Sequence, residues 1–320
     1  MKKILVFSKI ELKGNLQYFF YWGSDYMGSI QGAVIRFLLR KSNMWNKPLI
    51  EVRKSMSSIK SKGIPSGVSL KKIEIDGVPC EMFLCEENKK GKAILYFHGG
   101  GFCLGIYPAN REFVAGLAKA SGVNLYMPDF RLAPEHPFPA ALEDSVAVYK
   151  GMLKNGYNAE DIIVMGDSSG CALALSALQV VRQSGEKMPG ALVFITPVLD
   201  FSGKSETFRT NATKDPFKYK DPLSIAKIYL GENDPTSPMI SPLYGELGGL
   251  PPVLVHAGEY DVFLSDSCRF FESYKAAGGE AELKVWKKMW HIFHMQASLV
   301  PESKKALDEL CSFIRAKVKR

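Results

Sequence analysis

A serine between closely spaced glycines is the part of this sequence best suited to nucleophilic chemistry. Ser168 lies at the centre of the motif G-D-S-S-G at 166–170, which follows an apolar run at 162–165 and precedes another at 171–181. A strand that turns sharply into a helix in this way exposes the serine hydroxyl, and glycines two positions away on either side let strand and helix approach closely. A glycine-serine turn that merely caps a helix would look similar, but the strand and helix flanks favour a nucleophile. The residues that support the motif are Gly166, Asp167 and Gly170.

A motif with three consecutive glycines begins seventy residues before this serine. The motif H-G-G-G-F at 98–102 follows the apolar run 92–97, which we predict to be a buried strand. Glycines at such a point expose bare backbone N–H groups, as an oxyanion hole requires, although a flexible turn is the alternative. The predicted oxyanion donors are the N–H groups of Gly100, Gly101 and Ser169. The residues that support this loop are His98 and Gly99.

A serine hydroxyl needs a base to remove its proton, and the base needs an acid that fixes its tautomer. In enzymes with this strand, serine and helix arrangement, the acid and then the histidine follow the serine in the chain. Asp261 follows the predicted strand 252–257 and so lies at the carboxyl end of the sheet, where ligands bind. Glu259 and Asp266 are the competing acids.

The five histidines of the chain include two that follow the last predicted strand, His291 and His294. His291 comes first, in the loop between strand and helix, and we predict that it is the general base. His294 lies one helical turn further on, where a cap or a packed side chain is the ordinary role. The histidines expected to be structural are His98, His136 and His256.

Predicted strands and helices alternate over most of the chain. Strands are predicted at 71–75, 80–84, 92–97, 122–127, 161–165, 191–195, 252–257 and 281–286. Helices are predicted at 111–120, 140–154, 169–184, 265–277 and 301–317. Most of the strand candidates are continuously apolar, which is typical of parallel strands covered on both faces. The sequence therefore predicts an α/β protein whose mostly parallel central sheet is flanked by helices.

Two segments depart from this alternation and are predicted to form a cap. The first sixty residues hold the aromatic run 18–22 and apolar residues at helical spacing over 30–39, and we expect two amphipathic helices there. The stretch from about 200 to 249 is rich in Pro, Ser, Asn and Lys, and an excursion of this length between core strands is usually functional. We therefore divide the chain into an N-terminal helical part of the cap at 1–65 and a catalytic domain at 66–320, which carries a cap insertion at about 200–249.

The motifs and their order resemble those of the hormone-sensitive-lipase family of α/β-hydrolases. The matching stretches are HGGGF at 98–102, PDFRLAPEHPFPAALED at 128–144, GDSSG at 166–170, SPLYGELGGLPPVLVHAGEYDVFLSD at 241–266 and HIF at 291–293. This resemblance implies the α/β-hydrolase fold with a helical cap. It also selects Asp261, which matches the acid of the family's E-x-D motif, and it implies short-chain esters or lactones as substrates.

The sequence departs from the family pattern at three places near these motifs. Ser169 stands where members often have Ala, Val262-Phe263 where Pro-Leu is usual, and Ile292 where Gly commonly follows the histidine. None of these changes removes a predicted catalytic group, so we expect them to reshape the pocket.

Composition and charge exclude several other classes. The chain of 320 residues is 46% hydrophobic and 23% charged, as in an ordinary soluble globular protein. Its net charge of +8 comes from short, separate lysine clusters without interleaved aromatic residues, so we expect no nucleic-acid partner. No run approaches the roughly 20 apolar residues of a membrane span, and the apolar run at 4–7 is too short for a signal peptide.

Six cysteines without disulfide or metal-ligand spacing indicate reduced thiols and a cytoplasmic protein. No group of His, Cys and carboxylate residues has the spacing of a metal site, and no dinucleotide or phosphate motif occurs. We therefore expect neither a metal nor a cofactor.

The combined prediction is a serine carboxylic-ester hydrolase that acts on small, short-acyl esters through an acyl-enzyme. The same residues could cleave lactones or amides, or transfer the acyl group to another alcohol. From a different class, a non-catalytic small-molecule receptor can share the fold, although receptors that resemble this family have lost the histidine. A homodimer is compatible with the sequence.

Overall fold

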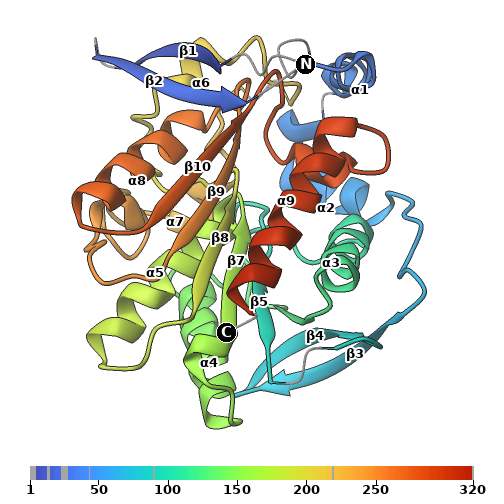
Figure 1. Cartoon of the computed structure of the whole chain (residues 1–320), viewed down its shortest axis with the longest axis vertical. Coiled ribbons are helices and arrows are strands. Elements are labelled where there is room, and N and C mark those ends of the chain that lie inside the picture. Colours follow the sequence, from blue (N-terminus) through green and yellow to red (C-terminus); the bar gives the residue numbers. More distant parts are fainter. Residues whose placement is uncertain are drawn as a thin grey trace.

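The computed structural model describes residues 5–12, 15–22, 28–42, 44–88, 91–217 and 220–318, with only the course of the backbone for the first two ranges. Within these residues an eight-stranded sheet runs through the molecule in the order β10-β9-β8-β7-β5-β6-β4-β3 (Figure 1). The strands are β3 (Val68–Ile75), β4 (Val78–Cys85), β5 (Ala93–Phe97), β6 (Asn124–Pro128), β7 (Ile162–Asp167), β8 (Ala191–Ile195), β9 (Val253–Gly258) and β10 (Ala281–Trp286). All neighbours from β10 to β6 are parallel, whereas β4 and β3 join antiparallel at one edge. The predicted mostly parallel sheet is confirmed.

Helices cover both faces of this sheet, which explains why the strands from β9 to β6 are buried along their whole length. On β5, Ile94 and Tyr96 point to one face and Leu95 and Phe97 to the other, and all four are buried. The first face carries α3 (Pro108–Ser121) and α9 (Pro301–Lys317). The second face carries α4 (Ala140–Lys154), α5 (Ser169–Gln183) and α8 (Leu264–Ala276). All five helices lie within two or three residues of their predicted bounds.

The N-terminal region holds a hairpin as well as helices. Strands β1 (Leu5–Leu12) and β2 (Asn15–Trp22) pair antiparallel as a separate two-stranded sheet. The aromatic run 18–22 therefore lies in a strand, so its assignment to a helical segment was wrong; consecutive aromatic residues favour extended backbone. Two helices do occur in the first sixty residues, α1 (Ile30–Lys41) and α2 (Leu49–Ser57), with the 3₁₀ turn η1 (Met44–Asn46) between them.

Short helices occupy the predicted insertion and the remaining connections. The insertion contains α6 (Thr207–Thr210), α7 (Ala226–Leu230) and the 3₁₀ turn η3 (Pro242–Tyr244). Two further 3₁₀ turns are η2 (Ala159–Asp161) and η4 (Phe293–Gln296). Among the residues described, none of the helices combines the length and the apolar content that a membrane crossing requires.

Candidate active site

Ser168 stands at the sharp turn between β7 and α5. Its backbone has φ +51° and ψ −124°, outside the regions that residues with a side chain commonly adopt. Its N–H donates to the carbonyl oxygen of Ile195 at 3.0 Å, so the end of β8 holds the turn in place. The turn therefore sets the serine side chain at the carboxyl edge of the parallel strands, as the motif predicts.

Two glycines permit this turn because backbone segments pass very close to them. A Cβ atom on Gly170 would lie 2.0 Å from the carbonyl oxygen of Phe97 at the end of β5. A Cβ atom on Gly166 would lie 2.6 Å from the carbonyl carbon of Gly170. No side-chain rotation can relieve either contact, because the opposing atoms belong to the backbone. The glycine spacing of the motif thus follows from the packing of α5 against the sheet.

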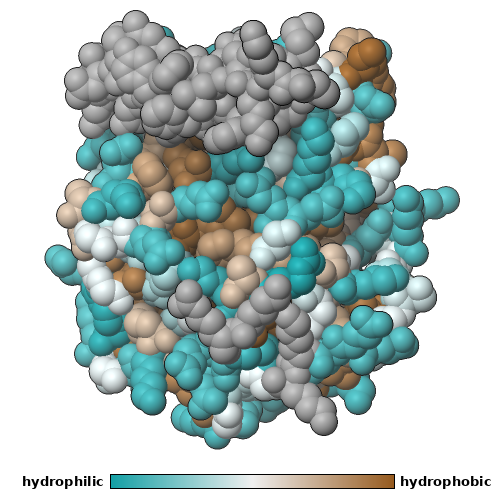
Figure 2. Space-filling view, in the orientation of Figure 1, coloured by the Kyte–Doolittle hydropathy of each residue, from teal (hydrophilic) through white to brown (hydrophobic). Residues whose placement is uncertain are grey.

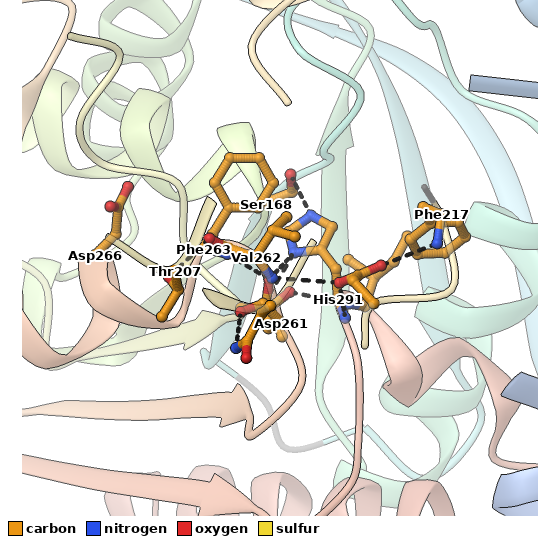
Figure 3. Close-up of polar contacts among 12 residues, drawn as sticks. Ser168, Thr207, Phe217, Asp261, Val262, Phe263, Asp266 and His291 are labelled. Carbon is orange, nitrogen blue, oxygen red and sulfur yellow. Dashed lines mark hydrogen bonds and ion pairs between the residues drawn. The ribbon is translucent and has the colours of Figure 1, made fainter. Parts of the chain in front are cut away.

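The predicted base and acid lie beside this serine (Figure 3). His291 follows β10, and its Nε2 lies 2.9 Å from Ser168 Oγ. Its Nδ1 lies 3.1 and 3.2 Å from the two carboxylate oxygens of Asp261, which follows β9. Because the carboxylate can only accept a hydrogen bond, this contact places the imidazole proton on Nδ1 and leaves the Nε2 lone pair facing Ser168. The arrangement can therefore deprotonate the serine.

The acid is held in place by burial and by its own loop. Asp261 is fully buried, and its Oδ1 accepts the N–H of Phe263 at 2.8 Å. The Phe263 ring packs against the imidazole, with 4.9 Å between ring centres. The loop after β9 thus fixes both the acid and one side of the base.

The competing candidates from the sequence have other partners. Glu259 accepts the N–H of Lys288 at 2.8 Å, and Asp266 accepts the N–H groups of Leu199 and Asp200 at 2.9 and 3.1 Å. Neither carboxylate contacts His291 among the contacts of the described residues. His294 is buried, with its Nε2 3.2 Å from Nδ1 of His256.

The glycine loop is tied to the serine turn through Asp167. One carboxylate oxygen of Asp167 accepts the N–H of Gly99 at 2.8 Å and the hydroxyl of Tyr96 at 2.7 Å. Burial raises the pKa of Asp167, and these two hydrogen bonds oppose the shift. His98 lies with its Nδ1 2.8 Å from the carbonyl oxygen of Gly99, and its ring stacks on Phe130. These contacts provide a structural basis for three of the predicted supporting positions, His98, Gly99 and Asp167.

One predicted oxyanion donor has a partner that the sequence did not reveal. The N–H of Gly101 donates to the side-chain oxygen of Ser169 at 2.8 Å. Ser169 is the position at which family members often have Ala, so a methyl group could not make this contact. The hydroxyl of Ser169, at the start of α5, therefore binds the glycine loop directly.

A cavity of about 60 Å³ opens over these residues. Its polar wall contains Ser168, His291 and the backbone of Gly100 and Gly101. Its apolar wall is formed by Trp45, Leu104, Tyr107, Val198, Phe201, Pro222, Leu223, Ile225, Ala226, Phe263 and Ile292. The N-terminal region and the insertion at 200–249 both contribute to this wall, so segments far apart in the sequence close over the serine.

Comparison with known proteins agrees with this geometry. Residues 94–295, more than half of the chain, match the family described as having the α/β hydrolase fold. The chain belongs to the α/β-hydrolase family. The hydrolase is 35% identical to an acetyl-hydrolase of Streptomyces hygroscopicus over 230 residues, which are 71% of this chain and 77% of that protein.

Solved structures give the same assignment. An esterase from the bacterial hormone-sensitive lipase family superposes with a TM-score of 0.84 and 34% identity, over 91% of this chain and 99% of that one. The esterase EstE5, in crystals soaked with p-nitrophenyl butyrate, superposes with a TM-score of 0.87 and 32% identity, over 91% of this chain and all of the other. The predicted resemblance to hormone-sensitive-lipase-like carboxylesterases is confirmed, and with it the assignment of the hydrolase as an enzyme of the carboxylesterase type.

A third carboxylate beside the base was missed by the sequence analysis. Asp215 is fully buried, and its Oδ2 lies 3.3 Å from the N–H nitrogens of both Val262 and His291. Its other oxygen accepts the N–H of Phe217 at 3.0 Å. The sequence holds no signal for this residue, because Asp215 lies in the insertion and meets the base only after the chain folds back.

Three carboxylates set the basicity of the imidazole in this hydrolase. Burial disfavours the charged form of His291, but the carboxylate of Asp261 outweighs it, with further contributions from Asp215 and Asp167. The pKa of His291 is therefore raised above its ordinary value. For Asp215, burial and then the negative charge of Asp261 raise the pKa of the carboxyl group.

Proposed function

We propose that this hydrolase cleaves small, short-acyl carboxylic esters through an acyl-enzyme formed on Ser168. The observation that carries the proposal is the hydrogen-bonded path from Ser168 through His291 to Asp261, which opens into the cavity. A hydroxyl, an imidazole and a carboxylate in this order are the elements of a serine nucleophile, a general base and its orienting acid.

In the proposed mechanism, Ser168 Oγ attacks the ester carbonyl carbon while Nε2 of His291 takes the serine proton. Asp261 holds the Nδ1 proton and stabilises the imidazolium that forms. The N–H groups of Gly100, Gly101 and Ser169 bind the carbonyl oxygen as it becomes negative, and Gly101 then shares its proton between this oxygen and Ser169 Oγ.

The intermediate collapses when His291 returns the proton to the alcohol oxygen, which leaves with the electron pair of the broken C–O bond. His291 then deprotonates a water molecule that attacks the acyl-enzyme, and the carboxylic acid leaves as Ser168 regains its proton. Acid and base roles are thus exchanged between the two halves of the reaction.

The lining of the cavity supports a short acyl group. Its volume is about 60 Å³. The aromatic and branched side chains of its wall leave little space for a long chain without movement of the cap. The acetyl-hydrolase relative and the neighbour soaked with a butyrate ester support the same range.

We also propose that the N-terminal helices and the insertion act together as the cap of this hydrolase. Trp45 from the first segment and Leu223 and Ile225 from the second line the cavity. Residues Val52 and Met56 of α2 pack on Leu104 and Tyr107 beside the glycine loop. The division at about residue 65 remains a prediction that limited proteolysis can test.

The test is hydrolysis of p-nitrophenyl esters from acetyl to dodecanoyl by the native protein, Ser168→Ala and His291→Ala. We expect short esters to turn over and each substitution to lower kcat by roughly 10⁴- to 10⁶-fold. The matched control is His136→Ala, which removes an exposed histidine and should leave kcat unchanged. Turnover that rises steadily with chain length would refute the short-acyl proposal, and activity retained by Ser168→Ala would refute the nucleophile.

A further inference from the structure

Residues 211–217 of the insertion, here named the strap, cross behind the acid and base loops. Asn211 begins the strap and donates its side-chain amide to the carbonyl oxygens of Glu259 and Asp261 at 3.0 and 2.8 Å. Asp215 then accepts the N–H groups of Val262 and His291 with a single carboxylate oxygen. The strap thus contacts the loop that carries Asp261 through both Asn211 and Asp215, and it contacts the loop that carries His291 through Asp215.

The geometry of Asp215 suits a link between the two loops. Its Oδ2 faces N–H groups from residues 262 and 291, which belong to loops that follow different strands, β9 and β10. Its Oδ1 is fixed by Phe217, two residues along the strap. A carboxylate accepts at both oxygens, whereas an amide would direct N–H protons at one of these donors. Asparagine therefore cannot reproduce the three contacts.

The strap is itself held by the N-terminal helix α1. Arg40 donates to the carbonyl oxygens of Thr213 and Asp215, the latter at 3.2 Å, and Arg36 donates to that of Lys214 at 3.2 Å. The Arg36 guanidinium also lies 4.9 Å from the ring centre of Tyr260, in the acid loop. Contacts therefore run without a break from α1 through the strap to the base.

We propose that Asp215 is a positioning residue for the proposed base and acid, and that α1 holds it in place through the strap. This inference rests on the proposed function, because it assigns Asp215 a role in the geometry of Ser168, His291 and Asp261. Asp215 does not contact the reacting atoms. It sets the spacing of the two loops and adds a negative charge beside the imidazole.

The charge of Asp215 supplies a readout that a purely structural residue would lack. Among the described residues, the ionisable groups that face His291 are Asp261, Asp215 and Asp167, which favour its protonated form, and His294, whose pKa burial lowers to about 3. Removal of the charge at 215 should therefore lower the pKa of His291. Since the neutral imidazole is the base, the acid limb of the rate profile should move to lower pH.

The experiment compares Asp215→Asn with Asp234→Asn. Asp234 is exposed, lies in the same insertion, and accepts the N–H of Thr236 in the same two-residue turn that Asp215 forms with Phe217. We expect Asp215→Asn to lower kcat roughly 10- to 100-fold with KM nearly unchanged, and to shift the acid limb downward. Asp234→Asn should match the native protein in both respects.

A second variant acts on the strap from outside the site. Arg40→Ala removes the clamp from α1 and keeps the carboxylate, so it should lower kcat less than Asp215→Asn does; it also tests the inference if Asp215→Asn fails to fold. Equal kcat and equal acid limbs in Asp215→Asn and the native enzyme would overturn the inference while leaving the proposed function intact. The proposed function fails by a different result, namely activity that survives Ser168→Ala and His291→Ala.

A separate observation concerns the outer face of α1. Four large apolar side chains on this face are exposed: Ile30 by 81%, Val34 by 50%, Phe37 by 58% and Leu38 by 54%. Their spacing places them on one side of the helix, and Figure 2 shows hydrophobic side chains gathered at the upper right, where α1 lies in Figure 1. On the opposite side, Ile35 and Leu39 pack against the protein. The helix is therefore apolar toward both the protein and the solvent.

The segment of the chain that contains this face is strongly basic. Residues 28–62 contain eight Lys and Arg residues and one Glu, a net charge of +7 out of +8 for the whole chain. The lysines in this stretch that are exposed include Lys41, Lys54, Lys60 and Lys62. Lys41 lies over the Phe37 ring, 4.7 Å from its centre, so a positive charge borders the exposed apolar face. An apolar helix face in a basic segment matches a surface with negative head groups and an apolar interior.

We propose that the outer face of α1 docks on an anionic lipid surface. Phe37 and Leu38 enter the apolar boundary of the lipid layer while the lysines contact its head groups. This face is connected to the cavity by a short stretch of chain: η1 follows α1, and its Trp45 forms part of the cavity wall. Docking does not depend on the chemistry at Ser168, so it is independent of the proposed function.

The test is sedimentation with vesicles of phosphatidylcholine, alone or with an equal amount of phosphatidylglycerol. All proteins carry Ser168→Ala, so that no ester is hydrolysed. We expect binding to the anionic vesicles only, weakened by high salt, and at least roughly tenfold weaker after Phe37→Ser with Leu38→Ser. The matched control is Met239→Ser, which removes an apolar side chain that is 43% exposed elsewhere on the surface.

Two results would overturn the docking proposal. One is binding that the double substitution leaves unchanged, or no binding to anionic vesicles at all. The other is self-association of the lipid-free protein that the double substitution abolishes, measured by sedimentation velocity, since the face would then be covered by a second copy. Circular dichroism of each variant verifies that α1 remains folded.

Discussion

Gly170→Ala tests the packing that places Ser168 at its turn. The added Cβ would lie 2.0 Å from the carbonyl oxygen of Phe97 and 2.8 Å from that of His98. Carbon and oxygen atoms normally stay at least about 3.3 Å apart, so α5 and the end of β5 must separate by roughly 1.3 Å. Overpacking of this kind costs about 1–3 kcal/mol, and more where only backbone can move. The higher helix propensity of alanine returns up to about 1 kcal/mol.

The same displacement should affect catalysis. The residue after the nucleophile and the glycine loop after β5 both border the contact, so Ser168 and the oxyanion donors move apart. A misplacement of about 1 Å costs on the order of 100-fold in rate. We therefore expect Gly170→Ala to lose about 2 kcal/mol of stability in urea titrations, the upper end of the overpacking cost less the helix-propensity gain, and roughly 100-fold in kcat for p-nitrophenyl butyrate.

Gly116→Ala is the matched control for this prediction. Gly116 lies within α3, and a Cβ there would meet no atom within 4 Å. The substitution should raise stability by up to about 1 kcal/mol through helix propensity alone and leave kcat unchanged. If Gly170→Ala were as stable and as active as Gly116→Ala, the argument from close backbone approach would be wrong.

Three further predictions concern charge and hydrogen bonding. Because the pKa of His291 is raised and the neutral form is the base, kcat/KM should fall on acidification with a midpoint above about 6.5, the ordinary histidine value; a midpoint below it would contradict the assigned carboxylate effect. Burial raises the pKa of Asp266 to about 7. The folded protein therefore loses stability as the pH rises from about 4 through 7, because the buried carboxyl group becomes charged. Asp266→Asn should unfold at a higher urea concentration than the native protein at pH 8, but not at pH 4. At pH 8 the substitution should raise the free energy of unfolding by on the order of 2–4 kcal/mol, because an uncharged amide replaces a carboxylate whose Oδ1 has no hydrogen-bond partner among the described residues. Equal urea midpoints for the native protein and Asp266→Asn at pH 8 would exclude a buried charge at this position. Ser169→Ala frees the N–H of Gly101 for the oxyanion and should raise kcat roughly 2- to 10-fold, the equivalent of one hydrogen bond, whereas a fall in kcat would make the hydroxyl itself a donor.

The sequence predicted those features that depend on local pattern. Continuous apolar runs located the strands of the sheet, since a strand covered on both faces has no polar side. The glycines around Ser168 located the turn, because backbone segments pass so close to these positions that a residue with a Cβ atom could not fit there. Chain order placed the base and left three acids open, of which the structure brings Asp261 to His291.

Features that depend on tertiary contact could not be predicted in this way. Asp215 looks like any acidic residue before a proline, and its contact with His291 exists only because the insertion folds back across two loops. The bond between Gly101 and Ser169 joins loops 68 residues apart. The aromatic run 18–22 was placed in a helical segment because its composition fits an amphipathic helix as well as a strand, and a pairing partner decided the outcome.

The arrangement of charge around His291 explains why the insertion contributes a residue to this site. A buried imidazole alone is a weak base, because desolvation opposes its protonation. Asp261 offsets this desolvation penalty by direct contact, and Asp215 and Asp167 also favour the protonated imidazole, from further away. In the proposed mechanism, each carboxylate stabilises the imidazolium that forms as Ser168 attacks. Burial raises the pKa of Asp167, and burial together with the negative charge of Asp261 raises the pKa of Asp215 to about 7. The carboxylates of Asp167, Asp261 and Asp215 each accept a hydrogen bond from a backbone N–H group, so the loops that position the base also hold the carboxylates around it in place.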